Sequence, residues 1–228
     1  MAHVLVICDR RYNGHQLWVA LGIFAQRGHT FEVMSTQRII EDEVTHKKSR
    51  IEWLVGEIPH EDMYKYNALM IISGFPKDTE AYWTNSIVLE YVDLFNHAGR
   101  PIAAICGSVP TIRGAARGKK VSFFPLVRSR ELLRQAGAIL QSVALTRDQN
   151  LVTAEHEMAS QMWAEEFCNL LEGRPQQYFF ETSAFTPKGS ERKPIPIVED
   201  IRRKLENGRN LREAQSPTQH GDSTPPVS

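Results

Sequence analysis

Residues 100–112 read Arg-Pro-Ile-Ala-Ala-Ile-Cys-Gly-Ser-Val-Pro-Thr-Ile, and this stretch decides the fold. Its apolar run, Ile102 to Cys106, predicts a buried strand. The pair Gly107-Ser108 then interrupts the run and predicts the start of a helix that takes Pro110 in its first turn. Cys106 is therefore expected on a tight turn that connects a buried strand to a helix.

The neighbours of Cys106 in the chain are typical of a nucleophile on such a turn. The residues two positions away on either side, Ala104 and Ser108, are small, as a strained strand-to-helix turn requires. The N–H of Gly107 would point towards a developing oxyanion, and the positive end of the helix favours thiolate over thiol. The alternative is that Cys106 is a small buried core residue, the commoner role of a free cysteine.

The N-terminal part of the chain predicts a parallel sheet. Val4 to Cys8 is a continuous apolar run, Gly14 to Arg27 carries apolar residues at helical spacing, and Thr30 to Met34 returns as a strand. Such a strand-helix-strand unit has a right-handed crossover and hence parallel strands. Ala68 to Ile72 predicts a further buried strand. We therefore expect a doubly wound α/β domain, with a mostly parallel sheet sandwiched by helices.

The remaining elements are predicted from the same periodicities. They are a loop over Gln37–Glu57 with a possible edge hairpin at Ile51–Leu54, a short helix over Pro59–Tyr64, a helix over Asn85–Ala98, short strands over Val143–Leu145 and Leu151–Thr153, and a helix that ends near Leu171. Five apolar residues are expected to face inward from the last part: Met158, Met162, Phe167, Leu170 and Leu171.

Composition and charge narrow the function classes. With 228 residues, 42% of them hydrophobic, the chain can form one α/β domain with an appendage. Its formal net charge of zero gives no electrostatic argument for nucleic-acid or membrane partners. The three cysteines, Cys8, Cys106 and Cys168, are too few and too scattered for a disulfide framework or a zinc site, so a reducing, cytoplasmic setting is expected. Neither a signal peptide nor an apolar run of membrane-spanning length is expected.

The character of the chain changes after Gly173. The domain is expected over residues 1–173, and an extension with an aromatic segment and a short helix over residues 174–214. Four aromatic residues, Tyr178, Phe179, Phe180 and Phe185, indicate a segment that docks on the domain, on a partner subunit or over the pocket. Residues 215–228 are rich in Ser, Thr, Pro and Gln and are predicted to be disordered.

Three chemically distinctive stretches are expected to meet at one edge of the sheet. Ligands of doubly wound folds bind at the carboxyl ends of the strands. Cys106, Gly74 and the loop Asp9–Gln16 each follow a predicted strand, so all three should lie at that edge. Basic residues between Arg113 and Arg134 are read as a solvated face that could attract an anion.

These residues resemble the ThiJ/PfpI family of the class I glutamine amidotransferase-like superfamily. The resemblance spans Val4 to Gly173 and rests on Val4-Leu5-Val6-Ile7 before a helix, on Ser73-Gly74 where the family has a Gly-Gly turn, and on Ala103-Ala104-Ile105-Cys106. It implies a flavodoxin-like fold with a nucleophile elbow at Cys106, and a homodimer or higher oligomer. The family includes amidases or proteases, deglycase-like enzymes, hydratases, chaperones and oxidative-stress sensors, so it does not imply one activity.

The chain departs from the family's usual site at three places. Many members have a glutamate in the first helix, where this chain has Gln16 with His15 beside it. Many have a histidine directly after the cysteine or in a Val-x-x-His-Pro stretch, where this chain has Gly107 and Phe124. A common Ser-Arg-x-Pro turn is replaced by residues 154–157, Ala-Glu-His-Glu.

These departures decide which residues we expect at a catalytic site. The amide N–H of Gln16 can donate to a thiolate as a protonated glutamate does, but an amide cannot shuttle protons. His156, flanked by Glu155 and Glu157, is the first candidate for that task and His15 the second. The alternative for each histidine is an ordinary surface position.

The remaining expected contacts involve the oxyanion and the substrate. Gly74 and Gly107 would supply oxyanion N–H groups. Four residues are candidates for binding substrate: Arg10, Arg11, Phe75 and Glu155. The two arginines could instead lower the thiol pKa or be ordinary surface charges. No metal or organic cofactor is expected, because covalent catalysis by a cysteine needs none.

Two functions of different classes follow. The leading hypothesis is an enzyme of the hydrolase, hydratase or lyase type, in which Cys106 attacks a small electrophile such as an aldehyde, amide or nitrile-like carbon. The alternative is a catalytically degenerate member that acts as a redox sensor or binding subunit, because both usual histidine positions are lost. A nucleotide-binding module is not supported, since Asp9 to Gly14 lacks a glycine-rich phosphate loop.

Overall fold

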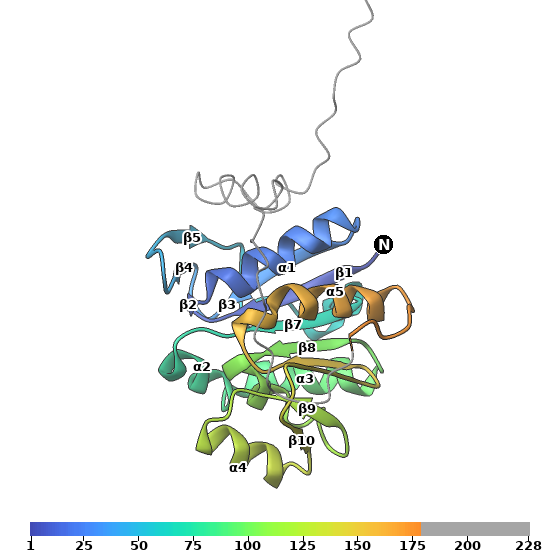
Figure 1. Ribbon diagram of the computed structural model, residues 1–228. Helices are drawn as coiled ribbons and strands as arrows, with labels where there is room; N and C mark the ends of the chain where they lie inside the picture. The colour runs from blue at the N-terminus through green and yellow to red at the C-terminus, as the bar shows by residue number, and fades with distance from the viewer. Residues whose placement is uncertain (179–228) are drawn as a thin grey trace, which may run out of the picture.

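Seven strands form one central sheet in the computed structural model, which describes residues 1–178 (Figure 1). Their spatial order is β11-β12-β8-β7-β1-β3-β6. The strands are β1 (His3–Cys8), β3 (Thr30–Ser35), β6 (Trp53–Leu54), β7 (Ala68–Ile72), β8 (Ile102–Ile105), β11 (Leu145–Asp148) and β12 (Leu151–Ala154). All neighbours pair in parallel except β11 with β12. The mostly parallel, flavodoxin-like sheet expected from the sequence is confirmed.

The strand that leads to Cys106 lies in the middle of this sheet. β8 pairs with β7, where Ile71 lies opposite Ala104, and with β12, where Ala154 lies opposite Ile105. All four residues of β8 are buried. Parallel strands covered on both faces have continuous apolar sequences, which is why the run before Cys106 predicts this position.

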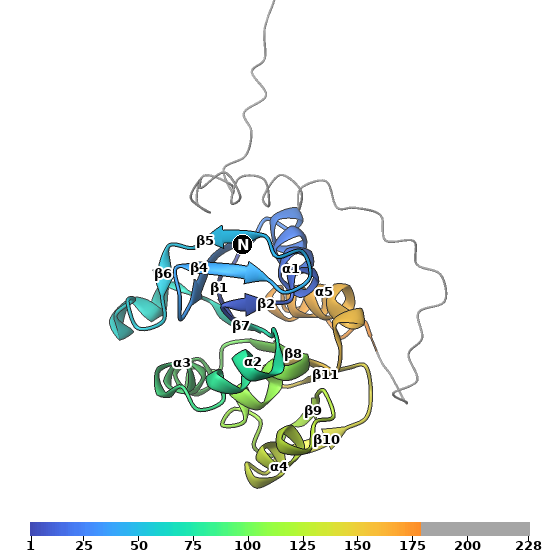
Figure 2. The ribbon, with the colours of Figure 1, turned by 90° about the vertical axis from the view of Figure 1, so that its left-hand side faces the viewer.

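Helices cover the sheet on both faces. α1 (Gly14–Gln26) and α5 (Ser160–Leu171) pack together on one face, and α2 (Pro76–Tyr82) and α3 (Ser86–His97) lie on the other (Figure 2). Alternate residues of β1 point into the two cores: Val4 and Val6 into the first, Leu5 and Ile7 into the second. This alternation is the reason why an uninterrupted apolar strand satisfies both layers.

Asparagine caps begin the two long helices that flank the site. The side chain of Asn13 accepts a hydrogen bond from Gln16 N–H at the start of α1, and Asn85 does the same for Val88 at the start of α3. Gly28 has a φ of 73° and follows the end of α1, as the sequence predicts for a terminating glycine.

The segment read as a loop between residues 37 and 57 is more structured than expected. β4 (Ile39–Asp42) and β5 (Lys48–Arg50) form an antiparallel hairpin, and β2 (Arg11–Tyr12) pairs in parallel with β4. The predicted hairpin at Ile51–Leu54 is wrong, because Trp53–Leu54 forms the parallel edge strand β6. The sequence does not predict the hairpin of β4 and β5, because this edge hairpin buries few apolar residues and so has no clear apolar pattern.

Two further segments and one residue differ from expectation. The short helix near Pro59 is the 3-10 helix η1 (His60–Lys65), and residues 113–141 contain β9 (Lys120–Ser122), α4 (Val127–Gln135) and β10 (Ile139–Gln141) in place of a plain solvated face. Met158, expected to face inward, is 45% exposed because it lies in η3 (Glu157–Ala159), before α5 begins.

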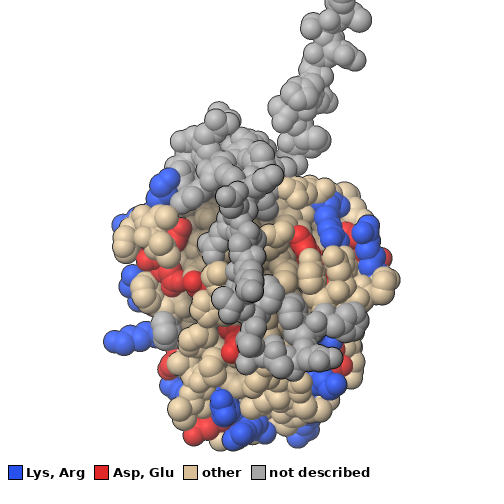
Figure 3. Space-filling view, viewed as in Figure 1, with Lys and Arg blue, Asp and Glu red and all other residues tan. Residues whose placement is uncertain are grey.

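After α5, residues 172–178 are the last that the structure describes, and they are held to the domain through Glu166 of α5. The buried carboxylate of Glu166 accepts from Arg147 at 2.8 Å and from the backbone N–H of Gln177 at 2.9 Å. Most of the predicted extension, including Phe179, Phe180, Phe185 and residues 215–228, lies outside the described residues. Within residues 1–178, no helix combines the length and apolar character needed to span a bilayer. Acidic and basic residues are interspersed on the face in Figure 3.

Candidate active site

Cys106 occupies a strained position directly after β8. Its φ of 56° lies in the left-handed region, which costs a non-glycine residue about 1–3 kcal/mol unless contacts hold it there. The Ser108 hydroxyl accepts from Ile105 N–H at 3.0 Å and lies 2.9 Å from the Ile71 carbonyl oxygen. Ser108 therefore ties the turn to the neighbouring strand, a role beyond the small size that the sequence indicated.

The helix after Cys106 is shorter and tighter than expected. η2 (Cys106–Ile112) is a 3-10 helix with Pro110 inside it. The indole Nε1 of Trp83, at the end of α2, donates to the Gly107 carbonyl at 2.9 Å. The turn is thus held from β7 by Ser108 and from α2 by Trp83.

The sulfur of Cys106 lies in a partly enclosed environment. Burial raises the pKa of the thiol to about 11, and the charges of Glu157 and Glu43 contribute in the same direction. The Gly107 N–H and the Ser73 hydroxyl lie close enough to the sulfur to stabilise its charged form, and they oppose this effect without cancelling it. The Gly107 N–H at the helix end favours the thiolate in the expected direction, but loss of hydration outweighs it, so the net effect is a raised pKa.

Gln16 acts on Cys106 through Ser73. The Gln16 Oε1 atom accepts from the Ser73 backbone N–H at 3.1 Å and from its hydroxyl at 2.8 Å. Since a hydroxyl has one proton, the Ser73 O–H donates either to Gln16 or to a thiolate. The predicted direct bond from the Gln16 amide to the sulfur is not among these contacts; Gln16 instead positions the serine that reaches the sulfur.

Cys106 opens into a cavity of about 340 Å³ at the carboxyl edge of the sheet. Of the residues expected at the site, five besides Cys106 line this cavity: Gln16, Gly74, Phe75, Gly107 and His156. His15, Arg10, Arg11 and Glu155 do not line it. The predicted convergence of the three strand ends is present, because Asn13, Gly74 and Cys106 all border the same space.

Gly74 allows a close approach of two chain segments, and its N–H already has a partner. Its N–H donates to Thr79 Oγ1 at 3.0 Å, so the expected oxyanion contact finds no support in this geometry. A Cβ at this position would lie 1.6 Å from the Arg11 carbonyl oxygen. The glycine therefore allows the bridge between residue 74 and Tyr12 of β2, whereas Gly107 keeps an N–H directed at the site.

The two arginines of the loop after β1 are engaged beside the cavity. Arg10 Nε donates to Asp78 Oδ1 at 2.7 Å. The guanidinium carbon of Arg11 lies 4.2 Å from the centre of the Phe75 ring, and Phe75 itself lines the cavity. Arg10 is thus paired with a carboxylate, whereas Arg11 Nε is buried with no hydrogen-bond partner within residues 1–178, and neither arginine lines the cavity.

His156 lies at the cavity and the other predicted acid-base groups do not. Its ring is exposed, 5.9 Å from the ring of Phe124, the residue at one of the family's histidine positions. His156 Nδ1 accepts from Met158 N–H at 3.3 Å, which assigns the proton of the neutral ring to Nε2. Glu155 is half-buried, and burial raises the pKa of its carboxyl group.

Sequence reasoning missed a pair of carboxylates at the cavity. Asn13 Nδ2 donates to Glu43 Oε1 at 2.7 Å and to Glu157 Oε2 at 2.8 Å. Burial raises the pKa of Glu43, and the nearby charge of Glu157 adds to this. Glu157 could have been suspected as a neighbour of His156, but nothing in the sequence places Glu43, from the end of the hairpin strand β4, at the same site.

A buried carboxyl group lies behind the cavity wall. The Thr79 hydroxyl, which accepts from Gly74 N–H, donates to Asp9 Oδ2. Burial raises the pKa of Asp9 well above its usual value. The Thr79 side chain thus connects this group to the cavity.

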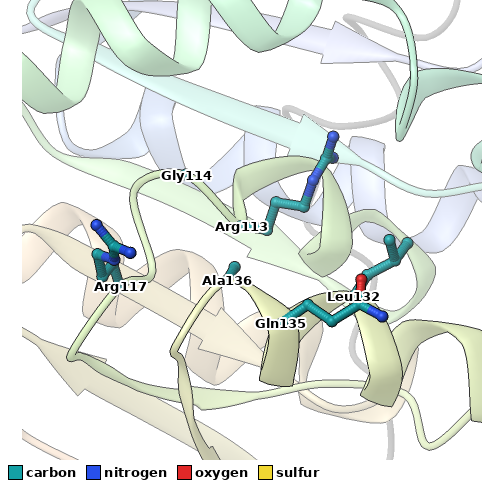
Figure 4. Close-up of a pocket in the computed structure, with 6 residues that line it drawn as sticks. All are labelled: Arg113, Gly114, Arg117, Leu132, Gln135 and Ala136. Carbon is teal, nitrogen blue, oxygen red and sulfur yellow. The ribbon is translucent and has the colours of Figure 1, made fainter.

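A second cavity, of about 410 Å³, lies between residues 113–117, which follow η2, and the C-terminal end of α4, and no nucleophilic side chain of the described residues lines it. Figure 4 shows Arg113 and Arg117 on opposite sides of it with their guanidinium groups apart. Arg113 Nη1 donates to the Trp83 carbonyl at 2.6 Å, so it supports the turn that holds Cys106.

Within residues 1–178, no group of three or more His, Cys, Asp or Glu side chains is arranged to hold a metal ion.

Comparison with known proteins places this site in context. The chain matches the DJ-1/PfpI family over residues 2–170. An uncharacterized protein of Methanocaldococcus jannaschii is 25% identical over 171 residues, which is 74% of this chain and 82% of that protein.

Two solved structures illustrate the likeness of the fold. A ThiJ/PfpI domain protein from Brachyspira murdochii superposes with a TM-score of 0.68 at 16% sequence identity. The superposition covers 76% of this chain and 98% of the Brachyspira chain. Oxidized DJ-1 from Toxoplasma gondii gives a TM-score of 0.62 at 16% identity, covering 75% and 91%. At these identities the structural likeness supports the fold alone.

Proposed function

Because this chain belongs to the DJ-1/PfpI family, whose members are cysteine-dependent enzymes or redox-sensing and chaperone proteins, we propose that it is a cysteine-dependent enzyme. The family resemblance drawn from the sequence is confirmed. The proposed reaction is of the hydrolase, hydratase or lyase type, on a small electrophile such as an aldehyde, amide or nitrile-like carbon. One observation carries the proposal: Cys106, in a left-handed conformation, opens into a cavity where the Gly107 N–H and Ser73 hydroxyl reach its sulfur.

The raised thiol pKa determines how the proposed chemistry begins. At neutral pH the sulfur keeps its proton, so proton removal must accompany attack. In the proposed step, a bond forms between Cys106 Sγ and the electrophilic carbon while the thiol proton moves to His156. The electron pair of the carbonyl or nitrile bond moves onto its heteroatom, near the Gly107 N–H.

His156 is the proposed base because it alone of the predicted acid-base groups lines the cavity. To accept a proton at Nε2, the ring must adopt its other tautomer and give up the bond from Met158 N–H. That bond is 3.3 Å long, so its loss costs about 1 kcal/mol or less. Gln16 keeps the role of a positioning residue through Ser73.

Substitution of Cys106 tests the proposal directly. Cys106→Ala should abolish turnover of a panel of small aldehydes, amides and nitriles while the melting temperature changes little. The matched control is Cys168→Ala, because Cys168 is fully buried in α5 and does not line the cavity. Turnover that survives in Cys106→Ala would falsify the proposal.

A second function is favoured by the protonated resting thiol. A degenerate member that binds a partner or ligand needs no thiolate, and both usual histidine positions are Gly107 and Phe124 here. A redox sensor needs a thiolate that peroxide oxidises readily, which a pKa of about 11 disfavours. Mass spectrometry after mild peroxide treatment separates the two: selective sulfinic acid at Cys106 supports a sensor, whereas equal oxidation of Cys106 and Cys168 argues against one.

The assembly and location of the protein are also proposals. We expect a homodimer or higher oligomer in the cytoplasm, with a small-molecule substrate and no nucleic-acid or membrane partner. Sedimentation velocity at several concentrations measures the oligomeric state, and a monomer at all of them contradicts the expectation.

A further inference from the structure

Two carboxylates from distant parts of the chain are held by one side chain and line the Cys106 cavity. Glu43 follows β4, and Glu157 begins η3 after β12. The Nδ2 group of Asn13 holds both, at 2.7 Å and 2.8 Å, while its Oδ1 caps α1. The bridge leaves one oxygen on each carboxylate, Glu43 Oε2 and Glu157 Oε1, without a hydrogen-bond partner in the described part of the chain.

These carboxylates are not neutralised by the protein. None of the ion pairs within residues 1–178 includes Glu43 or Glu157, and no lysine or arginine of that range lines the cavity. Arg11 favours the ionised form of Glu43, but less than the Glu157 charge opposes it. A half-buried pair of like charges is unfavourable unless a cation offsets it, so the arrangement calls for a positive group.

A second polar group in the cavity also lacks a partner. Gln16 is 1% exposed and lines the cavity. Its Oε1 is used by Ser73, whereas its NH2 group has no acceptor among residues 1–178. This NH2 group is not among the fully buried polar atoms of the described residues that lack a partner, so it is open to the cavity, where it can donate to an acceptor atom of a ligand.

The cavity is thus lined by groups of opposite hydrogen-bonding character. Around Cys106 lie donors, the Gly107 N–H and the Gln16 NH2. Glu43 and Glu157 line the same cavity, and the carboxylate oxygens that Asn13 does not bind are acceptors. A ligand that matches both has an electronegative acceptor atom at one end and a cationic donor group at the other.

We propose that Glu43 and Glu157 bind an ammonium, amidinium or guanidinium group of the substrate, whose carbonyl-type or nitrile-type carbon then faces Cys106. The inference rests on the proposed function for the role of Cys106 and extends it to a substrate class. Anionic substrates are excluded by the same two charges. Glu43 and Glu157 act here as specificity residues.

Charged thiol reagents test this selectivity without a known substrate. The rates at which Cys106 reacts with the cationic 2-(trimethylammonium)ethyl and the anionic 2-sulfonatoethyl methanethiosulfonate are measured at pH 8 by peptide mass spectrometry. Each rate is divided by that of free 2-mercaptoethanol, which removes the intrinsic preference of a thiolate for cations. The normalised ratio of cationic to anionic rates should be about tenfold or more, since each unit charge within several ångströms changes each rate a few-fold.

Variants assign the selectivity to the proposed residues. Glu43→Gln and Glu157→Gln should each reduce the ratio, and the double variant should bring it close to one. Glu41→Gln is the matched control, because Glu41 lies on the same hairpin strand, pairs with His46 and does not line the cavity. A normalised ratio near one in the wild-type protein, or a ratio that the double variant retains, overturns the proposal.

Reversible binding provides a measurement that does not depend on Cys106 reactivity. Benzamidine and benzoate have similar size and opposite charge, and their binding to Cys106→Ser is followed through the NMR signals of the Gln16 side-chain amide. Benzamidine should bind at least about tenfold more tightly than benzoate; Glu43→Gln should reduce the difference, and the double variant Glu43→Gln/Glu157→Gln should abolish it. Equal binding overturns the charge proposal.

The two failures are distinguishable. If Cys106 reacts with neither reagent nor with the neutral methyl methanethiosulfonate, the proposed function fails, and benzamidine binding still decides whether the carboxylates select cations. If Cys106 reacts with all three without charge preference, the proposed function stands and the substrate class is wrong. Circular dichroism of each variant shows that it is folded.

Discussion

The protonation of Cys106 is the property on which the proposed chemistry depends most, and its reactivity should rise steeply with pH. An ordinary thiol with a pKa of about 8.5 is roughly one-quarter thiolate at pH 8. With a pKa of about 11, Cys106 is roughly one-thousandth thiolate at that pH, which is about 200-fold less. A more basic thiolate is a better nucleophile, by about tenfold for this difference, so the net rate should be about 20-fold below that of an ordinary thiol.

The assay is the rate of iodoacetamide labelling of each cysteine between pH 6.5 and 9.5, read by mass spectrometry on the native protein. Free glutathione serves as the reference thiol. The logarithm of the Cys106 rate should increase by one per pH unit up to pH 9.5 without levelling off. Cys168, whose pKa burial raises to about 12, should react more slowly throughout.

A substitution at Ser73 tests whether its hydroxyl stabilises the thiolate form of Cys106. Ser73→Ala removes a hydrogen bond that favours the charged sulfur, and such bonds contribute about 1.5–3 kcal/mol. The thiol pKa should therefore rise by about one to two units, which slows labelling at pH 8 roughly threefold to tenfold. A Cys106 rate that levels off at pH 8.5 or below refutes the argument, because burial would then not control the thiol.

Three other predictions concern the contacts around the site. Gly74→Ala should lower the free energy of unfolding by about 3 kcal/mol or more, because its Cβ would meet the Arg11 carbonyl oxygen; urea unfolding measures this, and a loss below 1 kcal/mol contradicts it. Trp83→Phe keeps an aromatic ring but removes the donor to the Gly107 carbonyl and part of a fully buried side chain, and should cost more than about 1 kcal/mol in the same assay, whereas no change would show that the bond does not hold the turn. The melting temperature of Asp9→Asn should rise relative to that of the wild type as the pH increases from about 5 to 8. Burial raises the pKa of Asp9, so the folded state keeps a proton that the unfolded state releases. The contribution of this group to wild-type stability therefore falls as the pH rises, until the pKa of the folded state is passed. A variant-minus-wild-type difference that stays constant over this range would show that Asp9 ionises normally.

Most of the fold could be predicted because its signals are local. The strands β1, β7 and β8 are buried on both faces and therefore have continuous apolar sequences, whereas α1 is buried on one side and has apolar residues at helical spacing. Each pattern can be recognised within one short segment of the chain. The hairpin β4–β5 escaped prediction because its residues alternate irregularly and its partner β2 lies far back in the sequence. Met158 was misplaced because a 3-10 turn, invisible in the periodicity, shifts the start of α5.

The candidate site was only partly predictable. Cys106 and Gln16 could be placed by the elbow pattern and by the family resemblance, and the rule that ligands bind at carboxyl ends of strands brought them to one edge. The predicted oxyanion role of Gly74 found no support, since whether an N–H is free depends on Thr79, which a later helix brings to it.

The sequence by itself determined the sheet, the turn at Cys106 and the edge at which a site forms, because these depend on burial patterns within short segments. Only the tertiary structure decided the protonation of that cysteine and the partners of its cavity. Burial of the thiol is a property of everything packed around it, and Asn13, Glu43 and Glu157 meet through contacts between segments separated by up to 144 positions. Electrostatic effects depend on distance in space, which no local pattern encodes.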